Sequence, residues 1–418
     1  MKVRYRYRVE PTPQQSRDLA RVFGCARVVY NDAIRLREQV RAAGGRIGPT
    51  AVQAAVTARA KVTPERAWLV EVSSDALIQA VRDCNTAYAN FFASLSGKRA
   101  GRRMGAPRLR SRKDNRQSVR FSRNGFRLGL DGRLYVAKIG SLKVRWSRDL
   151  PSEPSSVTII READGKFYAS FVVERDPTPL PGTDLECGLD LGLTTMAVVA
   201  DTEGCITTVA NPRQLARRQR HLRRVQRQLC RKKKGSSNRA KARLKVAKVH
   251  GKIRRARADH HHKLALVLVR DNQVVHVENL NIAGMIRNRR LARAISDAAW
   301  GLLISCLKAK AEQHGRIVHV VDRWLPSSKT CSQCGHKLAA LALTVRAWTC
   351  PTCGAEHDRD GNAAVNILAA GQAERRNACG AHVRLPSGAA TGVEARTTPI
   401  QRRSRRGIDA LVGGEDVK

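Results

Sequence analysis

The sequence predicts a multidomain α+β protein that combines a helical part, a barrel-like β module and a C-terminal α/β part. Three observations predict this class. Short strands bounded by turn residues fill 118–175, helical patterning precedes them, and strands alternate with helices from 184 to about 370. A chain of 418 residues is long enough to build separate domains with hydrophobic cores.

The N-terminal part is expected to be one strand followed by helices. Residues 1–10 alternate basic with apolar or aromatic side chains, which predicts a strand with one charged face. Thr12 is the expected N-cap of the next helix, and Pro13 suits its first position. Helical patterning continues to about residue 95, and 65–95 is expected to contain a long amphipathic helix. The expected apolar face of the first helix consists of Leu19, Val22, Phe23, Ala26, Val29 and Tyr30.

The middle of the chain is expected to be β structure. A Gly- and Arg-rich connector at 96–115 precedes it, and the segment PTPLPGTD at 177–184 follows as a linker. Between them the strands read SVRFS, FRLGL, RLYVAK, LKVRW, SVTIIRE and KFYASFVVER. Asp-Gly pairs at 131–132 and 164–165 predict hairpin turns. A small antiparallel, barrel-like module follows from this pattern.

The C-terminal part is expected to be an α/β unit because strands and helices alternate there. The expected elements are the strands ECGLDLG and MAVVA within 184–210, a basic helical segment from 213 to about 270 broken at 235–238, the strand 274–278, a helix over 297–315 and the strand 316–323. Beyond 371 the chain is rich in Ala, Gly, Arg and Ser without a sustained period, so the segment 371–418 is expected to be a disordered tail.

The charge of the chain points to a polyanionic partner. It carries 78 Lys and Arg against 35 Asp and Glu, a formal net charge of +43. Such a chain repels itself unless a polyanion neutralises it. We find no apolar run of about 18 residues and no signal-peptide pattern, so nucleic acid is favoured over a membrane. Aromatic residues make up only 4%, which favours binding through backbone charge and shape over base stacking.

The strongest motif is a pair of Cys-x-x-Cys turns. Cys331 and Cys334 are separated by 15 residues from Cys350 and Cys353, a spacing that predicts a closed, structural Cys₄ zinc site. Gly335 and Gly354 follow the two pairs, where such a turn needs an unusual backbone angle. Two disulfides or free thiols are the alternatives, but a long chain with scattered cysteines fits a reducing compartment. Four sulfurs fill the shell, so His357 is expected to pack or to form hydrogen bonds.

Three separated carboxylates are candidates for a magnesium site. Asp190 and Glu278 lie at the ends of apolar strands, and Asp360 lies at the start of a helix. Hard cations prefer oxygen ligands, and two Mg²⁺ ions about 4 Å apart can activate a water and stabilise the leaving oxygen of a phosphodiester. Each acid also has a structural interpretation. Asp190 could form a turn, Glu278 a salt bridge, and Asp360 a helix cap.

Several strings in the chain resemble one protein family. GLDLGLTTMAVV, VVHVENLNIAGM, PSSKTCSQCG and CPTCGAEHDRDGNAAVNI resemble the split RuvC motifs and zinc ribbon of TnpB proteins, transposon-associated RNA-guided endonucleases related to type V CRISPR effectors. The opening MKVRYRYRVEPTPQQ, the segment GAPRLRSRKDNRQS and the basic stretch from Arg231 are similar to TnpB as well. The resemblance covers residues 1 to about 370.

The resemblance implies a domain organisation and catalytic residues. It implies a helical recognition lobe inserted in a β-barrel-like wedge module, followed by an RNase H-like (RuvC) nuclease domain with an inserted Cys₄ zinc ribbon. The implied ranges are 1–10 with 107–183 for the wedge, 11–106 for the helical lobe, 184–326 with 358–370 for the nuclease, and 327–357 for the ribbon. Asp190, Glu278 and Asp360 match the three RuvC acids, with Asp358 as the alternative third acid. Gly361 departs from the family, whose members more often carry a larger residue there.

The implied function is RNA-guided cleavage of double-stranded target DNA beside a short flanking motif, with two catalytic Mg²⁺ ions and one structural Zn²⁺. Residues 211–260 include 20 Lys or Arg, and such a run repels itself unless a polyanion lies beside it; a solvated helical surface is the alternative. The resemblance implies that guide RNA and its duplex with DNA lie in this basic channel. The candidate contacts are Arg217, Arg218, Arg220, Arg224, Lys232, Lys233, Lys234, Arg254 and Arg257.

Other functions share parts of this pattern. A transposase with an RNase H-like site, a compact type V CRISPR effector and a non-cleaving DNA-binding regulator are the alternatives; the intact acids argue against the last. We expect no membrane partner and no small-molecule substrate. A cytoplasmic, prokaryotic location is expected because no targeting segment is evident.

Overall fold

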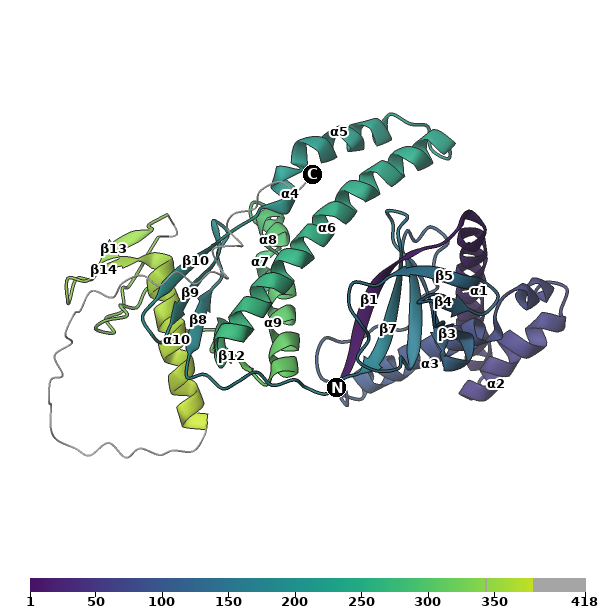
Figure 1. Ribbon diagram of the computed structural model, residues 1–418, viewed down its shortest axis with the longest axis horizontal. Helices are drawn as coiled ribbons and strands as arrows, with labels where there is room; N and C mark the ends of the chain where they lie inside the picture. The colour runs from purple at the N-terminus through teal and green to yellow at the C-terminus, as the bar shows by residue number, and fades with distance from the viewer. Residues whose placement is uncertain (343, 379–418) are drawn as a thin grey trace. The chain divides into compact units, whose positions relative to one another are not determined.

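The computed structural model describes residues 1–342 and 344–378 (Figure 1). The chain divides into two compact units. Of the described residues, 1–176 and 231–248 form the first unit, and 177–230, 249–342 and 344–378 form the second. Among the described residues, no helix has the length and apolar character needed to cross a bilayer.

Seven strands of the first unit form one antiparallel sheet in the order β2-β6-β7-β1-β5-β4-β3. The strands are β1 (Lys2–Glu10), β2 (Gln117–Ser122), β3 (Phe126–Leu128), β4 (Leu134–Val136), β5 (Gly140–Arg145), β6 (Ser156–Arg161) and β7 (Phe167–Glu174). The N-terminal strand β1 lies between β7 and β5, so it belongs to the same sheet as the later segments. Gly132 and Gly165 have the positive φ angles, 71° and 80°, that the two predicted hairpin turns require.

The alternation predicted for the first strand is present in β1. Tyr5, Tyr7 and Val9 are buried, whereas Arg4 and Arg6, which alternate with the tyrosines, are exposed. Successive side chains of a strand point to opposite faces, so the apolar set enters the core and the arginines face solvent.

Helices α1 (Pro13–Ala42), α2 (Pro49–Ala54) and α3 (Ser74–Leu95) form the helical part of the first unit. Thr12 caps α1 in a capping box: its hydroxyl accepts from the N–H of Gln15, whose side chain accepts from the N–H of Thr12. All six residues of the predicted apolar face are buried. They share one hydrophobic core with the sheet, so the helical lobe and the β module are not separated by a core boundary. Short helical turns, including a π-helical turn at Ala55–Arg59, interrupt the helical patterning between α1 and α3.

The second unit is built on a five-stranded sheet in the order β10-β9-β8-β11-β12. Its strands are β8 (Glu186–Asp190), β9 (Thr195–Asp201), β10 (Ile206–Ala210), β11 (Val274–Glu278) and β12 (Ile317–Val321). β8, β11 and β12 pair in parallel, whereas β9 pairs antiparallel with both β8 and β10, so β10 runs in the same direction as β8. The three parallel strands therefore end at the same edge of the sheet, which we term the carboxyl edge.

The C-terminal part of α6 (Ser237–Asp271) and α9 (Trp300–His314) pack on one face of this sheet, and α10 (Arg359–Ala378) packs on the other (Figure 1). The remaining helices are α4 (Gln214–Arg217), α5 (Gln219–Cys230), α7 (Ile282–Met285) and α8 (Ala292–Ala298). Cys187 and Leu189 of β8 share a core with α6 and α9. Gly188 between them faces α10 so closely that a Cβ would lie 2.2 Å from the carbonyl oxygen of Ala364. Glycine at this position lets α10 lie directly on the sheet.

The prediction that 371–418 is a disordered tail is wrong for residues 371–378. α10 continues to Ala378. Glu374 explains the extension, because its carboxylate is hydrogen-bonded to His319 Nε2 at 2.8 Å and to the N–H of Asp322 at 3.1 Å. Arg375 adds an ion pair with Glu186 of β8. These partners lie far away in the sequence, so local composition did not indicate them. The rest of the predicted tail, 379–418, lies outside the described residues.

Candidate active site and metal centre

The three predicted acids meet at the carboxyl edge of the second sheet. Asp190 ends β8 and Glu278 ends β11, and these strands are paired in register at Leu189 and Val277. Asp360 is the second residue of α10. Burial, followed by the negative charges of Glu278 and Asp360, raises the pKa of Asp190 to about 7. The structure thus gathers three carboxylates whose mutual repulsion a cation would relieve.

Each of the other two acids has one further partner. The hydroxyl of Ser327, a buried residue, donates to Glu278 Oε1 at 2.6 Å. A guanidinium nitrogen of Arg346 lies 3.3 Å from Oδ1 and 3.4 Å from Oδ2 of Asp360. Each carboxylate oxygen has further lone pairs, so both groups can still accept a hard cation. The residues present therefore fit a Mg²⁺ site by the chemistry of their donor atoms, whereas among the described residues only the four cysteines below have ligand atoms that all lie within 4.8 Å of one another.

Asp358, the alternative third acid, has a different position. Its Oδ1 accepts a hydrogen bond from the N–H of Gly361 at 2.8 Å, as a residue capping a helix does. Asp358 is exposed, whereas Asp360 is partly buried and is one of the charges that act on Asp190. The same cap holds Gly361, so the start of α10 is ordered despite the glycine.

The four predicted zinc ligands form one cluster. The Sγ atoms of Cys331, Cys334, Cys350 and Cys353 all lie within 4.8 Å of one another, and no disulfide joins cysteines in the described part of the chain. Gly335 and Gly354 have φ angles of 75° and 72°, the left-handed conformation expected after each pair. Burial opposes ionisation of Cys350, but N–H groups of Cys353 and Thr352 and neighbouring thiols lower its pKa to about 6. A closed set of four neighbouring sulfurs fits one tetrahedral Zn²⁺ ion.

His357 lies beside this cluster as a hydrogen-bonding residue. It is buried on β14 (Glu356–Asp358), which pairs with β13 (Ala347–Thr349). Its Nε2 lies 3.0 Å from Cys331 Sγ, and its ring packs 4.7 Å from the ring of Trp348. This agrees with the expectation that His357 packs or forms hydrogen bonds.

The predicted basic segment forms α5 and the greater part of α6. α5 buries Leu222 and Val225 and exposes most of its charged residues. Of the candidate contacts, the exposed ones are Arg217, Arg220, Arg224, Lys232, Lys233, Lys234 and Arg254. Arg218 is partly buried and donates to Gln214 Oε1 at 2.7 Å.

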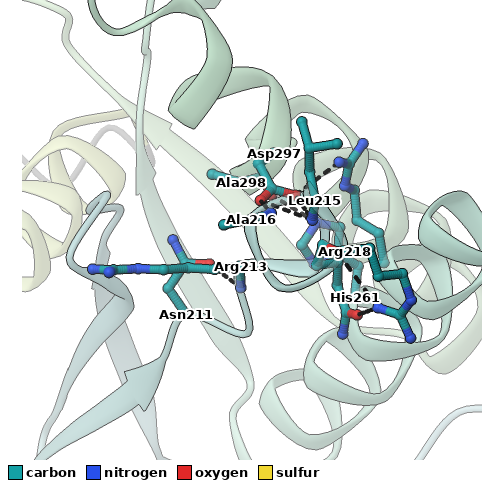
Figure 2. A network of polar contacts seen from close by, with 10 residues as sticks. Asn211, Arg213, Leu215, Ala216, Arg218, His261, Asp297 and Ala298 are labelled. Atoms are coloured by element: carbon teal, nitrogen blue, oxygen red, sulfur yellow. Dashed lines mark hydrogen bonds and ion pairs between the residues drawn. The ribbon is translucent and has the colours of Figure 1, made fainter. Parts of the chain in front are cut away.

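Arg257 differs from the other basic candidates because it forms an ion pair with an acid. Its Nη2 donates to Asp297 Oδ1 at 2.9 Å, and its side chain is only 20% exposed. Asp297 also accepts hydrogen bonds from the N–H groups of Leu215 and Ala216 in the first turn of α4 (Figure 2). Sequence reasoning did not single out Asp297, because its partners lie 40 and more residues away.

Family comparisons cover most of this architecture. Residues 170–289 match a family described as "Probable transposase", and residues 300–367 match "Cas12f1-like, TNB domain". Residues 1–46 match a family described as "Helix-turn-helix domain".

Two curated relatives span nearly the whole chain. A protein of Streptomyces pristinaespiralis named "Putative RNA-guided DNA endonuclease" is 43% identical over 91% of this chain and 91% of its own length. The InsQ protein of Escherichia coli, which has the same description, is 30% identical over 88% of this chain and 92% of its own. The chain belongs to the TnpB family.

The fold of this TnpB-family chain is also found among solved structures. In a cryo-EM structure of a Cas12f1–sgRNA–target DNA complex, the matching chain superposes with a TM-score of 0.52 at 15% identity, over 85% of this chain and 83% of that one. At this identity the likeness concerns the fold alone, a multidomain α+β arrangement.

In this TnpB-family chain, two asparagines that sequence reasoning missed tie the cysteine cluster to the acids. Asn362 and Asn366, one turn apart on α10, each donate to the carbonyl oxygen of Thr330 at 2.7 Å. Asn366 also donates to the carbonyl oxygen of Ser327 at 2.7 Å, and Asn362 Oδ1 accepts from the N–H of Ser332. Ser327 contacts Glu278, so the segment that leads into the cluster also reaches an acid. The i, i+4 spacing in NAAVN was the available signal.

Proposed function

We propose that this TnpB-family protein is an RNA-guided DNA endonuclease of the RuvC type, which cuts DNA after its guide RNA pairs with a target beside a short flanking motif. The convergence of Asp190, Glu278 and Asp360 at one sheet edge is the observation that carries the proposal. Two relatives that match this chain over nearly their full length are named putative RNA-guided DNA endonucleases, which supports the proposal.

The second unit is proposed to be the RNase H-like nuclease domain. In its sheet, the antiparallel pair β9 and β10 lies on one side of β8, and the parallel strands β11 and β12 lie on the other. This strand arrangement agrees with the RNase H-like class. Asp190, Glu278 and Asp360 would hold two Mg²⁺ ions, which when bound supply an activated water and stabilise the departing 3′ oxygen. The protein contributes a partly buried Asp190 that ionises when a cation compensates it, and a Ser327 hydroxyl that orients Glu278.

The zinc ribbon is proposed to bind one structural Zn²⁺ through Cys331, Cys334, Cys350 and Cys353. Four sulfur ligands leave no open position, so this ion would stabilise the fold and take no part in the chemistry. The ribbon would hold Ser327 in place for Glu278.

Guide RNA and double-stranded target DNA are the proposed partners. The exposed basic residues of α5 and α6 would contact phosphates of the RNA and of its duplex with DNA, while base pairing would supply most of the sequence specificity. We expect Arg257 to contribute less to nucleic-acid binding than these exposed residues, because its guanidinium is already paired with Asp297.

Sequencing the RNA that co-purifies with the protein tests this proposal. The chain should be expressed with its native downstream DNA, as wild type and as Asp190→Ala. We expect both proteins to carry one discrete RNA with a constant scaffold and a variable 3′ end, and only the wild type to cut a matching target. Heterogeneous RNA or none, or persistent cutting by Asp190→Ala, would contradict the proposal.

A transposase with the same acids is the second candidate, favoured by the family description that matches residues 170–289. It would join DNA ends without a guide. Strand-transfer products formed in the absence of RNA would support it, and their absence in an assay where RNA-dependent cleavage occurs would exclude it.

A further inference from the structure

A groove lined by arginines lies beside the candidate active site, and the residues predicted to bind nucleic acid do not include them. It has a volume of about 740 Å³ and lies within the second unit. We call it the arginine groove. Its basic residues are Arg213, Arg289, Arg290 and Arg293, and its apolar wall includes Leu193 and Leu291.

The arginine groove has uncompensated positive charge. Asp297 is the one acid among its lining residues, and its carboxylate is already engaged by Arg257 and by the N–H groups of Leu215 and Ala216. Arg213, Arg289 and Arg290 are exposed, and in the described part of the chain no ion pair joins these three to an acid. A groove with three exposed guanidinium groups that no ion pair joins to an acid, and with one neutralised carboxylate, favours an anion with several phosphates.

The backbone around the groove is held in place by specific contacts (Figure 2). Asn211 Nδ2 donates to the carbonyl oxygen of Leu193 at 2.9 Å, and Asn211 Oδ1 accepts from the N–H of Arg213 at 3.0 Å. Arg213 has a φ of 43°, a left-handed conformation that is unfavourable for a residue with a side chain and is maintained here by its neighbours. The backbone that lines the groove therefore has a defined conformation. It is also directly connected to the strand that bears Asp190, because Leu193 follows Asp190 by three positions.

We propose that the arginine groove binds the sugar-phosphate backbone of the DNA strand that is being cut and leads it to the three acids. This inference rests on the proposed nuclease function. A volume of this size is typical of small-ligand sites, so it can hold a few nucleotides of a single strand. Guanidinium groups bind phosphates, and the apolar wall can contact sugars and bases. The position next to Asp190 favours the substrate strand over the guide RNA.

Arginine footprinting tests the assignment directly. The Asp190→Ala protein, with its RNA bound, is treated with phenylglyoxal with and without a 20-nucleotide single-stranded DNA, and modified arginines are located by mass spectrometry. We expect Arg289 and Arg290 to react in the RNA complex and to be protected when DNA is added, while Arg287 reacts in both states. Protection by RNA alone would assign the groove to the guide, and no protection in either state would leave it without a nucleic-acid ligand; both results overturn the proposal.

A variant pair gives a second measurement. Arg289→Ala with Arg290→Ala should weaken single-stranded DNA binding about tenfold and lower the salt slope of the affinity by about 1.4, since each lost phosphate contact on a single strand removes about 0.7. Arg287→Ala, an exposed neighbour outside the groove, is the matched control and should change neither quantity. Equal effects in both proteins would contradict the proposal. If the protein carries no guide RNA, the DNA footprint still reports on the groove, so the two proposals fail separately.

Discussion

At the scale of single residues, the site consists of charges that the fold places close together. Asp190 shows this most clearly, because the pKa of its carboxyl rises to about 7 when burial and two neighbouring acids oppose ionisation. A pKa raised in the folded state means that folding favours the protonated form. This contribution to stability is complete below the ordinary value of 3.8 and is lost as the pH rises through about 7.

Asp190→Asn should therefore stabilise the metal-free protein at high pH. The amide carries no charge, so we expect a Tm several degrees above that of the wild type at pH 8 and little difference at pH 4. Adding Mg²⁺ should raise the Tm of the wild type and have little effect on the variant. Thermal unfolding at the two pH values, with and without Mg²⁺, checks this. A lower Tm for the variant at pH 8 without metal would contradict it.

Ser327→Ala should weaken the cation site without unfolding the protein. The Ser327 hydroxyl donates to Glu278 Oε1 at 2.6 Å, and loss of such a supporting partner typically reduces metal affinity or activity about 10- to 100-fold. We expect a higher Mg²⁺ concentration for half-maximal cleavage and unchanged RNA binding. Ser305→Ala is the matched control, because that exposed hydroxyl bonds only to the carbonyl oxygen of Gly301 in its own helix. Identical Mg²⁺ dependence in the two variants would argue against the role of Ser327.

At the scale of elements, the ribbon (327–357), which contains the four cysteines, supports the acid site through α10. Asn362 and Asn366 hold the segment from Ser327 to Thr330, so loosening the ribbon should also loosen the partner of Glu278. Cys334→Ser should lower the zinc content from one ion per chain to none and reduce cleavage at least about tenfold at saturating Mg²⁺. Metal analysis by mass spectrometry and a cleavage assay measure both. Cys230→Ser, which changes an exposed cysteine of α5, should retain zinc and activity.

The basic helices contain two kinds of arginine, and variants should separate them. The double variant Arg220→Glu, Arg224→Glu replaces two exposed positive charges with negative ones, so RNA affinity and its salt dependence should fall while the Tm changes little. Arg257→Ala instead leaves Asp297 without its charged partner, which should cost about 2 kcal/mol of unfolding free energy. Filter binding and chemical denaturation measure the two effects. The reverse pattern would show that Arg257 faces RNA and that the α5 arginines are structural.

At the scale of the whole molecule, local patterns predicted the elements well and long-range contacts poorly. The strand 274–278, the cap at Thr12 and the two Cys-x-x-Cys turns depend on neighbouring residues, so the sequence alone indicates them. The Asp297 contacts and the arginine groove depend on residues 82 and more positions apart, which no local pattern reveals. The last turns of α10 were missed for the same reason. The meeting of the three acids was predicted only through family resemblance, since spacing alone left other interpretations open.

The central claim, guided cleavage by the three acids, is tested most directly with the purified RNA–protein complex and Mg²⁺. Two plasmids would be compared, one that matches the variable end of the bound RNA and one with that sequence scrambled, each offered beside the same library of flanking motifs. We predict that the wild type linearises only the matched plasmid and that Asp190→Ala linearises neither. Equal cleavage of both plasmids, or cleavage by Asp190→Ala, would contradict the account.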